Sequence, residues 1–233
     1  MKSIFFAATI ALSLTTLSVL AQDARQTRNI SGVKRLKARM GMDVFVKIGE
    51  HESLHIEARG LREDQLVIEQ KGDELTLSLK LEGVFEKNEQ NRRNYVKAYL
   101  TVRQLQAVEA HSGASVTGES PFESPSFTVE SKAGANVSLN LKARDVTIDA
   151  GSGATVELSG TATTVSASAG AGASVNADKL VAETVDANAS AGASIRINAQ
   201  KELFGKASVG GSVSNKGPGR IVSKRTSLGG SVN

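Results

Sequence analysis

The sequence contains no cysteine and no tryptophan, and it has only two tyrosines and seven phenylalanines among 233 residues. Without thiols the chain can form no disulfide and cannot be anchored through a lipidated cysteine, so apolar burial and backbone hydrogen bonds must stabilise it. The scarcity of aromatic rings predicts a thin core with little room for them. It also leaves few surfaces of the kind on which sugar rings stack.

The sequence also lacks a large excess of one charge, and it has few long apolar runs. The 28 basic residues nearly balance the 24 acidic ones, which argues against a dedicated nucleic-acid surface. Lys2 precedes an apolar run from Ile4 to Leu20, and Val19 and Ala21 suit a cleavage site. This pattern predicts a signal peptide over residues 1–21 and export to the periplasm, the cell surface or the medium. No second run is long enough to span a bilayer.

A glycine recurs about every 20 residues through the second half of the chain. A valine or isoleucine stands three residues after each glycine, and an alanine or glycine stands one residue after it. The glycines are Gly113, Gly134, Gly153, Gly172, Gly192, Gly210 and Gly229. A repeat of this length cannot bury its apolar residues alone, so neighbouring repeats must stack. The predicted fold class is all-β, a single-stranded parallel β-helix (β-solenoid) with coils of about 20 residues.

Apolar or small residues alternate strictly with polar residues or glycine over 146–158, 165–177 and 185–197. A period of two residues is typical of strands. The alternation predicts an inward file in each coil, with Val156, Val175 and Ile195 in contact as one buried ladder. The same parity places Ser152, Ala171 and Ala191 in the inward files.

The glycines have the opposite parity and point outward. A recurring corner with positive φ is the simpler explanation. The alternative is a bare strip of backbone that a partner can approach closely. Small polar residues follow two positions after each glycine, and hydrogen bonds along the stack explain them without a ligand.

The remaining chain divides into three parts. Residues 22–31 are polar and predicted to be disordered, and 32–233 form one β-helix domain. Within that domain, 32–105 supply strands that form either the first coils or a cap, and 106–233 supply the repeats. Leu75, Leu77 and Leu79 exemplify the alternation in the first half, with a turn expected at Gly72-Asp73. The charged segment 83–94 is predicted to be a loop, and no amphipathic helix is expected.

These segments resemble a known family of exported bacterial proteins. The resemblance is carried by Met40-Gly-Met-Asp-Val-Phe-Val-Lys-Ile, by Leu54-His-Ile-Glu-Ala, by Asp73-Glu-Leu-Thr-Leu and by the Ser-Gly-Ala-Ser-Val repeats. The family is called putative auto-transporter adhesin, head GIN domain. The resemblance covers nearly the whole mature chain and implies a β-helical fold and export. It supplies no catalytic residues.

Motifs for chemistry are missing from the sequence, which has no nucleophile elbow, no P-loop and no zinc motif. We therefore predict no catalytic residue, no cofactor and no metal site. The outward residue four positions before each glycine forms a column that begins with Glu109, Glu130 and Asp149 and ends with Lys206 and Arg225. The three acids form a possible ligand face for a sugar or a cation. The alternative is a solvated surface with scattered ion pairs.

Two functional interpretations follow. The first is a non-enzymatic exported module, a rigid solenoid whose faces bind a cell-surface glycan or protein. The alternative is a carbohydrate-binding or polysaccharide-degrading β-helix protein with a weak acidic groove. The repeats offer only Phe122, Phe127 and Phe204 as aromatic platforms, which favours the first interpretation. Neither involves nucleic acid or a transmembrane segment, and the oligomeric state stays open.

Overall fold

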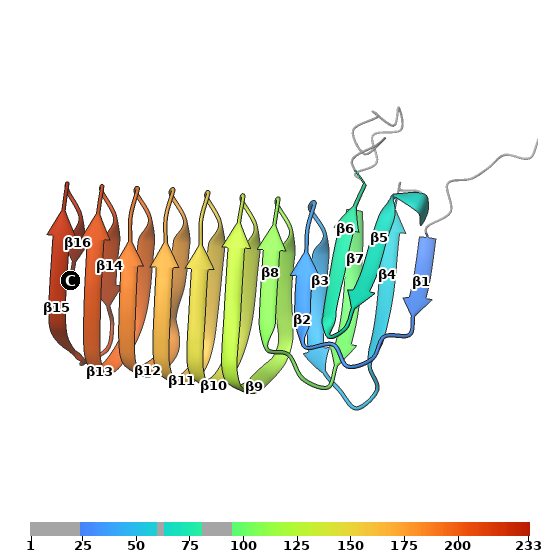
Figure 1. Ribbon diagram of the computed structural model, residues 1–233, viewed down its shortest axis with the longest axis horizontal. Coiled ribbons are helices and arrows are strands. Elements are labelled where there is room, and N and C mark those ends of the chain that lie inside the picture. The colour runs from blue at the N-terminus through green and yellow to red at the C-terminus, as the bar shows by residue number, and fades with distance from the viewer. Residues whose placement is uncertain (1–23, 60–62, 81–94) are drawn as a thin grey trace, which may run out of the picture.

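In the computed structural model, which describes residues 24–59, 63–80 and 95–233, the strands join into one 16-stranded sheet wound into a solenoid (Figure 1). The N-terminal strands are β1 (Ala24–Arg28), β2 (Arg35–Ala38), β3 (Asp43–Ile48), β4 (Ser53–Arg59), β5 (Leu66–Lys71), β6 (Glu74–Leu79), β7 (Tyr95–Val102) and β8 (Ala107–His111). The later strands are β9 (Ser115–Lys132), β10 (Asn136–Ala150), β11 (Thr155–Ala169), β12 (Ser174–Ala189), β13 (Ser194–Ser208), β14 (Ser212–Asn215), β15 (Arg220–Ser227) and β16 (Ser231–Val232). The described residues contain one short 3-10 helix, η1 (Glu63–Gln65), and no α-helix. The predicted parallel β-helix is confirmed.

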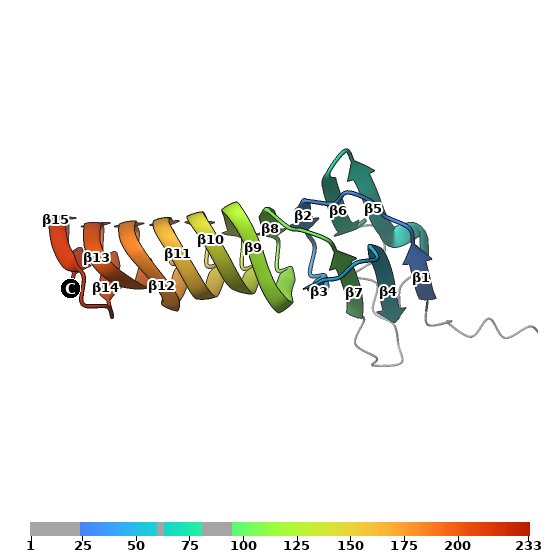
Figure 2. The ribbon, with the colours of Figure 1, turned by 90° about the horizontal axis from the view of Figure 1, so that it is seen from below.

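Each long strand runs around most of one coil. In β10 the first half, Asn136–Leu141, descends behind the stack, and the second half, Asp145–Ala150, rises in front of it (Figure 1). We call the outward surface of the first halves the rear face and that of the second halves the front face. β10 pairs in parallel with β9 and β11, so equivalent residues of successive coils lie side by side. Figure 2 shows the same stack from below, with the cap strands gathered at one end.

The recurring glycines close a tight turn at the upper ridge of each coil. Gly153 and the preceding Ser152 both have positive φ, 71° and 52°, and the N–H of Ala154 donates to the carbonyl of Gly151 at 3.2 Å. Two consecutive residues with positive φ define a type I′ turn, whose second position favours glycine. The glycine N–H also donates to the carbonyl of Ala171 in the next coil at 3.0 Å. The glycine column is therefore a corner, as the simpler explanation predicted.

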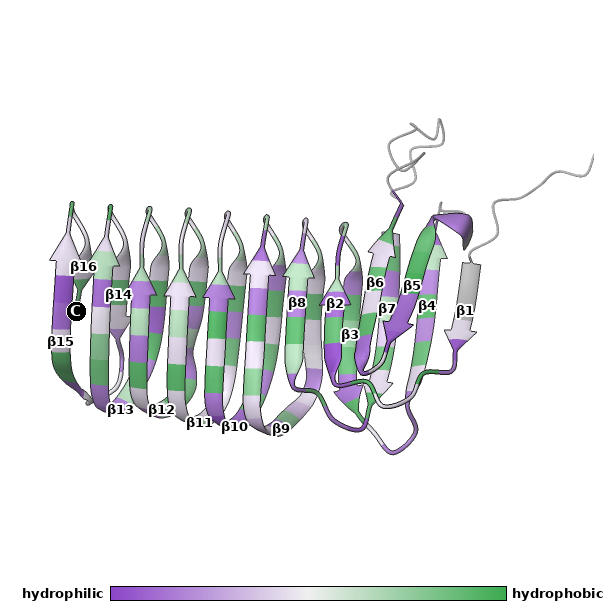
Figure 3. Cartoon of the chain, viewed as in Figure 1, coloured by the Kyte–Doolittle hydropathy of each residue, from purple (hydrophilic) through white to green (hydrophobic). Residues whose placement is uncertain are grey.

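The core is a narrow apolar layer between the two faces. Val156, Val175 and Ile195 lie in register and are at most 1% exposed, which confirms the predicted ladder. Figure 3 shows the alternation of apolar and polar residues along the strands that builds this layer.

One part of the predicted inward file is wrong. Ser152, Ala171 and Ala191 are exposed and have positive φ, because each is the first residue of a ridge turn. A two-residue turn preserves the even spacing between the flanking buried residues, so the alternation passes through it unchanged. Parity alone therefore cannot distinguish a turn residue from an inward one.

The N-terminal strands form both a coil and a cap. β2 pairs in parallel with β8, and β3 pairs in parallel with β9, so 35–48 make the first coil of the solenoid. The ridge turn of this coil is Met40-Gly41, and Val44 stands three residues after Gly41 as in the later repeats. The chain then leaves the stack and builds antiparallel pairs β4–β7, β1–β4 and β5–β6 before it returns at β8.

The segment 22–31 differs from the prediction. The structure places Ala24–Arg28 in β1, antiparallel to β4, where the sequence predicted disorder. A polar strand at the edge of a sheet can be held by backbone hydrogen bonds alone, and such a strand carries no apolar pattern for sequence analysis to detect. The predicted signal peptide and the predicted loop at 83–94 lie outside the described residues. Within the described ranges no helix is long and apolar enough to cross a membrane.

Candidate functional site

The three acids predicted to form a ligand face lie together on the front face of the solenoid. The sheet register places Lys37, Glu109, Glu130 and Asp149 side by side on β2, β8, β9 and β10. Glu109 is directly opposite Glu130, and Glu130 is directly opposite Asp149. Like charges in this arrangement repel unless cations compensate them.

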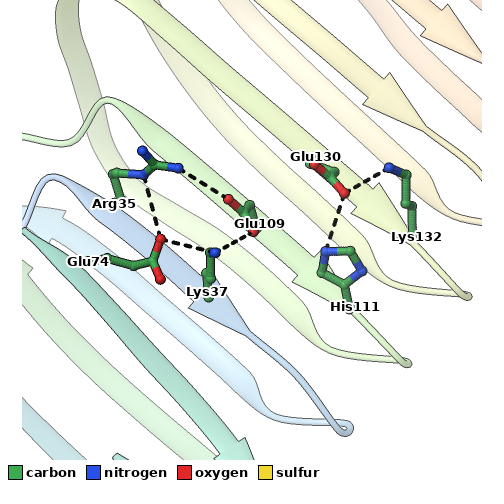
Figure 4. Close-up of polar contacts among 7 residues, drawn as sticks. All are labelled: Arg35, Lys37, Glu74, Glu109, His111, Glu130 and Lys132. Atoms are coloured by element: carbon green, nitrogen blue, oxygen red, sulfur yellow. Dashed lines mark hydrogen bonds and ion pairs between the residues drawn. The ribbon is translucent and has the colours of Figure 1, made fainter. Parts of the chain in front are cut away.

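Cations from the same face lie between these carboxylates (Figure 4). The Lys132 ammonium is 2.8 Å from a carboxylate oxygen of Glu130 and 2.8 Å from one of Asp149. The Lys37 ammonium lies 3.0 Å from Glu74 and 3.2 Å from Glu109. Lys132 therefore bridges carboxylates of the adjacent strands β9 and β10, and Lys37 on β2 bridges carboxylates of β6 and β8, the strands on either side of it.

Two weaker contacts complete the group. Arg35 is 3.7 Å from Glu74 and 3.6 Å from Glu109, and the His111 Nε2 is 3.5 Å from Glu130. The His111 side chain is 23% exposed and directed toward Glu130 (Figure 4). The group is thus a mixed-charge network that extends across β6, β2, β8, β9 and β10.

The bridging contacts raise the pKa of both lysines. For Lys132 the hydrogen bond to Asp149 is the largest cause and the one to Glu130 the next, so its pKa lies above the ordinary lysine value of 10.5. For Lys37 the hydrogen bond to Glu74 raises the pKa most, against a smaller opposing effect of burial. Both ammonium groups are therefore charged throughout the neutral range.

This geometry limits what the predicted ligand face can do. The carboxylates of Glu130 and Asp149 both contact the Lys132 ammonium, so a ligand that binds them has to displace this lysine. Among the described residues no group of three or more His, Asp and Glu side chains is arranged to hold a metal ion.

Sequence analysis missed Lys37 because its coil lies outside the recognised repeats. The position of Lys132, two residues after Glu130 on the same strand, could have indicated this ion pair from the sequence.

A second arrangement, on the rear face, was not predicted. Phe45 on β3 and Tyr99 on β7 are register partners, and their rings stack with centroids 5.3 Å apart and an interplanar angle of 17°. His55 on β4 is the register partner of Tyr99 on the other side, with ring centroids 6.3 Å apart. We call these three residues the aromatic row. Tyr99 is 37% exposed, so the row reaches the surface.

A shallow trough adjoins the aromatic row. It has a volume of about 200 Å³, and its polar lining comes from β9, β10 and β11: Ser115, Thr117, Asn136, Ser138, Thr155 and Glu157. Phe45 pairs directly with Thr117, so the row and the trough are continuous across the β3–β9 boundary. Register continues the column from Thr117 to Ser138 and Glu157.

The aromatic residues considered from the sequence do not supply such a platform. Phe122 and Phe127 are fully buried, and their rings pack 6.2 Å apart in the core. Phe204 is half-buried on the front face of β13. Sequence analysis missed the aromatic row because its members, at positions 45, 55 and 99, meet only through pairing of strands that are distant in the sequence.

Comparison with known families matches the chain along most of its length. The sequence profile of the family described as "Putative auto-transporter adhesin, head GIN domain" matches residues 33–219. The chain belongs to this family. The match begins just before β2 and ends just before β15, so it includes the first coil, both candidate sites and most of the stack.

Solved structures share the fold of this family member. A "putative adhesin" from Bacteroides fragilis superposes with a TM-score of 0.76 at 19% identity, covering 91% of this chain and 95% of that one. A "putative lipid binding protein" from Parabacteroides distasonis gives a TM-score of 0.66 at 15% identity, covering 90% and 96%. A "putative adhesin" from Parabacteroides merdae gives 0.60 at 17% identity, covering 90% and 95%. At these identities the likeness establishes the fold alone. Comparison with the curated proteins gives no match.

Proposed function

We propose that this protein is exported and acts as a non-enzymatic adhesion or interaction module. In this proposal the solenoid is a rigid rod whose long faces bind molecules at a cell surface. The family membership supports an adhesion-like role, and the pattern at residues 1–21 supports export.

The observation that carries the non-enzymatic part is the pairing of the front-face acids. Glu130 and Asp149 share the Lys132 ammonium, with 2.8 Å contacts to each. Hydrolysis of a glycoside requires one carboxyl group that donates a proton and a second that acts as base or nucleophile. The Lys132 ammonium contacts both carboxylates, so neither can serve as that donor or base while these ion pairs are in place. This supports a surface that binds rather than one that cleaves.

The regular register supports the binding part of the proposal. Equivalent residues of β9 to β13 repeat across the stack, so each face is a flat array with strand spacing of about 4.8 Å. Such an array can contact an extended ligand along several coils at once. Repeat proteins commonly use extended surfaces of this kind for binding.

Fractionation and a bead assay test the proposal. N-terminal sequencing of the protein from periplasmic, surface and medium fractions should give a chain beginning at Gln22. Beads coated with chain 22–233 should attach to cultured host or bacterial cells more than beads coated with denatured chain. Equal attachment of both bead types would contradict the adhesion role.

A polysaccharide-degrading role predicts a different result. The native chain would release reducing ends from a polysaccharide, and Glu130→Gln would abolish the release. Observation of both effects would replace the proposed function with the enzymatic alternative.

A further inference from the structure

We propose that the rear-face trough and the aromatic row form a binding site for a neutral oligosaccharide. The inference rests on the proposed function and specifies the ligand class for that function. It is separate from the front-face acids, which belong to the ion-pair network.

The lining of the trough suits the hydroxyl groups of a sugar. Ser115, Thr117, Ser138 and Thr155 offer hydroxyls that both donate and accept, and Asn136 offers an amide that does the same. Asn136 and Ser138 are exposed on this face. A ligand rich in hydroxyls can pair with such groups, whereas an apolar ligand would leave them without partners.

The aromatic row supplies an apolar wall at one end of the trough. Tyr99 covers one side of the Phe45 ring, and the other side is directed toward β9, where the register partner is the smaller Thr117. Because a phenylalanine ring extends farther from a sheet than a threonine side chain, the outer part of the ring rises above its neighbour. A pyranose ring seated over Thr117 can therefore pack its C–H groups against Phe45.

Charge favours a neutral sugar over an acidic one. Glu157 is the single charged residue among those that line the trough, and Asp43 is the register partner of Ser115 at its border. Two carboxylates with no lysine or arginine in the lining would repel uronic or sialic acids. The trough crosses three strands at about 4.8 Å spacing, so it accommodates a short oligosaccharide rather than a single ring.

Asn176 lies next to the trough, one strand beyond its lining. It follows Glu157 in the same column, and its buried Oδ1 has no hydrogen-bond partner among the residues that the structure describes. An unpaired buried acceptor is costly, and native proteins rarely retain one. Rotation of the amide toward the trough would let this oxygen accept a hydrogen bond from a sugar hydroxyl.

Calorimetric titration of chain 22–233 with cellohexaose and with chitohexaose tests the site. We expect saturable binding of at least one of these probes. Ser138→Trp fills the trough and should abolish the binding, and Phe45→Leu keeps an apolar side chain but removes the ring and should weaken it roughly tenfold. Ser166→Trp is the matched control, because Ser166 is an exposed serine on the front face, and it should bind as the parent does. Circular dichroism and thermal melts confirm that each variant is folded.

The outcomes separate this inference from the proposed function. Absence of saturable binding to either probe, or equal binding by the parent and folded Ser138→Trp, would overturn the oligosaccharide site. If beads still attach to cells in that case, adhesion stands and its ligand is of another class. If beads fail to attach as well, the proposed function fails with it.

Discussion

A Cβ atom on Gly211 would lie 2.4 Å from the carbonyl oxygen of Ala189 in the preceding coil. The equivalent position in five earlier coils is alanine: Ala114, Ala135, Ala154, Ala173 and Ala193. At Gly211 the backbone therefore lies closer to the backbone of the preceding coil than a side chain would allow.

Gly211→Ala should destabilise the protein even though it restores the consensus of the repeat. The added methyl group meets backbone, which cannot move aside without disturbing the ladder, so we expect a loss of about 1–3 kcal/mol in the free energy of unfolding. Urea denaturation measures it. Gly151→Ala is the control, because its Cβ would meet only the Lys132 side chain at 3.8 Å. An unchanged or higher free energy of unfolding in Gly211→Ala would show that Gly211 does not lie this close to the Ala189 carbonyl.

Val209→Asn should stabilise the protein. Val209 is the first residue of a ridge turn, has φ +49° and is 54% exposed. A β-branched residue is strained in this conformation, which Asn tolerates and which Asn-Gly turns adopt readily. We expect a gain of about 1 kcal/mol, measured as a higher melting temperature. An unchanged or lower melting temperature would argue against the type I′ turn at Val209-Gly210.

Val175→Ala should cost about 1–2.5 kcal/mol of unfolding free energy, since Val175 is 1% exposed within the core ladder. Val181→Ala on the same strand is the matched control, because Val181 is 41% exposed and should lose much less. Denaturant titration of both variants gives the comparison. Similar losses in the two would contradict the inward register.

Lys132→Met should weaken the fold modestly and in a pH-dependent manner. The substitution leaves Glu130 and Asp149 adjacent without their shared cation, and the partial exposure of the network limits the loss to less than about 1 kcal/mol. Because the folded-state pKa of Lys132 is raised, its contribution is fully present below the unfolded value near 10.5 and is lost as pH rises through the folded-state pKa.

The parent and Lys132→Met should therefore differ in unfolding free energy at pH 7 and converge at strongly alkaline pH. Added salt should also reduce the difference. Lys142→Met is the control, because among the described residues Lys142 pairs with Glu123 alone and both side chains are about two-thirds exposed. A difference that persists unchanged above the lysine range would exclude the ion pairs as its cause.

The repeat itself was predictable from the sequence because its signals are local. Glycine spacing, alternation and the Val ladder each lie within a single coil, and like residues stack by register. The first coil was not identified, since 72 residues rather than about 20 separate Gly41 from Gly113. The intervening chain builds the cap, and Met42 replaces the alanine that marks later turns.

The column of front-face acids was predictable from the sequence. The lysines that compensate their charge were predictable only in part. Lys132 lies two residues from Glu130, whereas Glu74 and Lys37 join the network through the cap and the first coil. The aromatic row depends entirely on long-range pairing of β3, β4 and β7. Strand partners distant in sequence are the information that composition and periodicity do not contain.

Because the chain contains no cysteine, single cysteines can be introduced and coupled to a bulky polyethylene glycol to block one face at a time. Asn136→Cys places the label in the rear-face trough, and Ser168→Cys places it on the front face. Both positions are exposed, so labelling should preserve the fold. Attachment of coated beads to cells should be lost with the rear face blocked and retained with the front face blocked. Retention with the rear face blocked, or equal loss from both labels, would contradict the assignment of binding to the rear face.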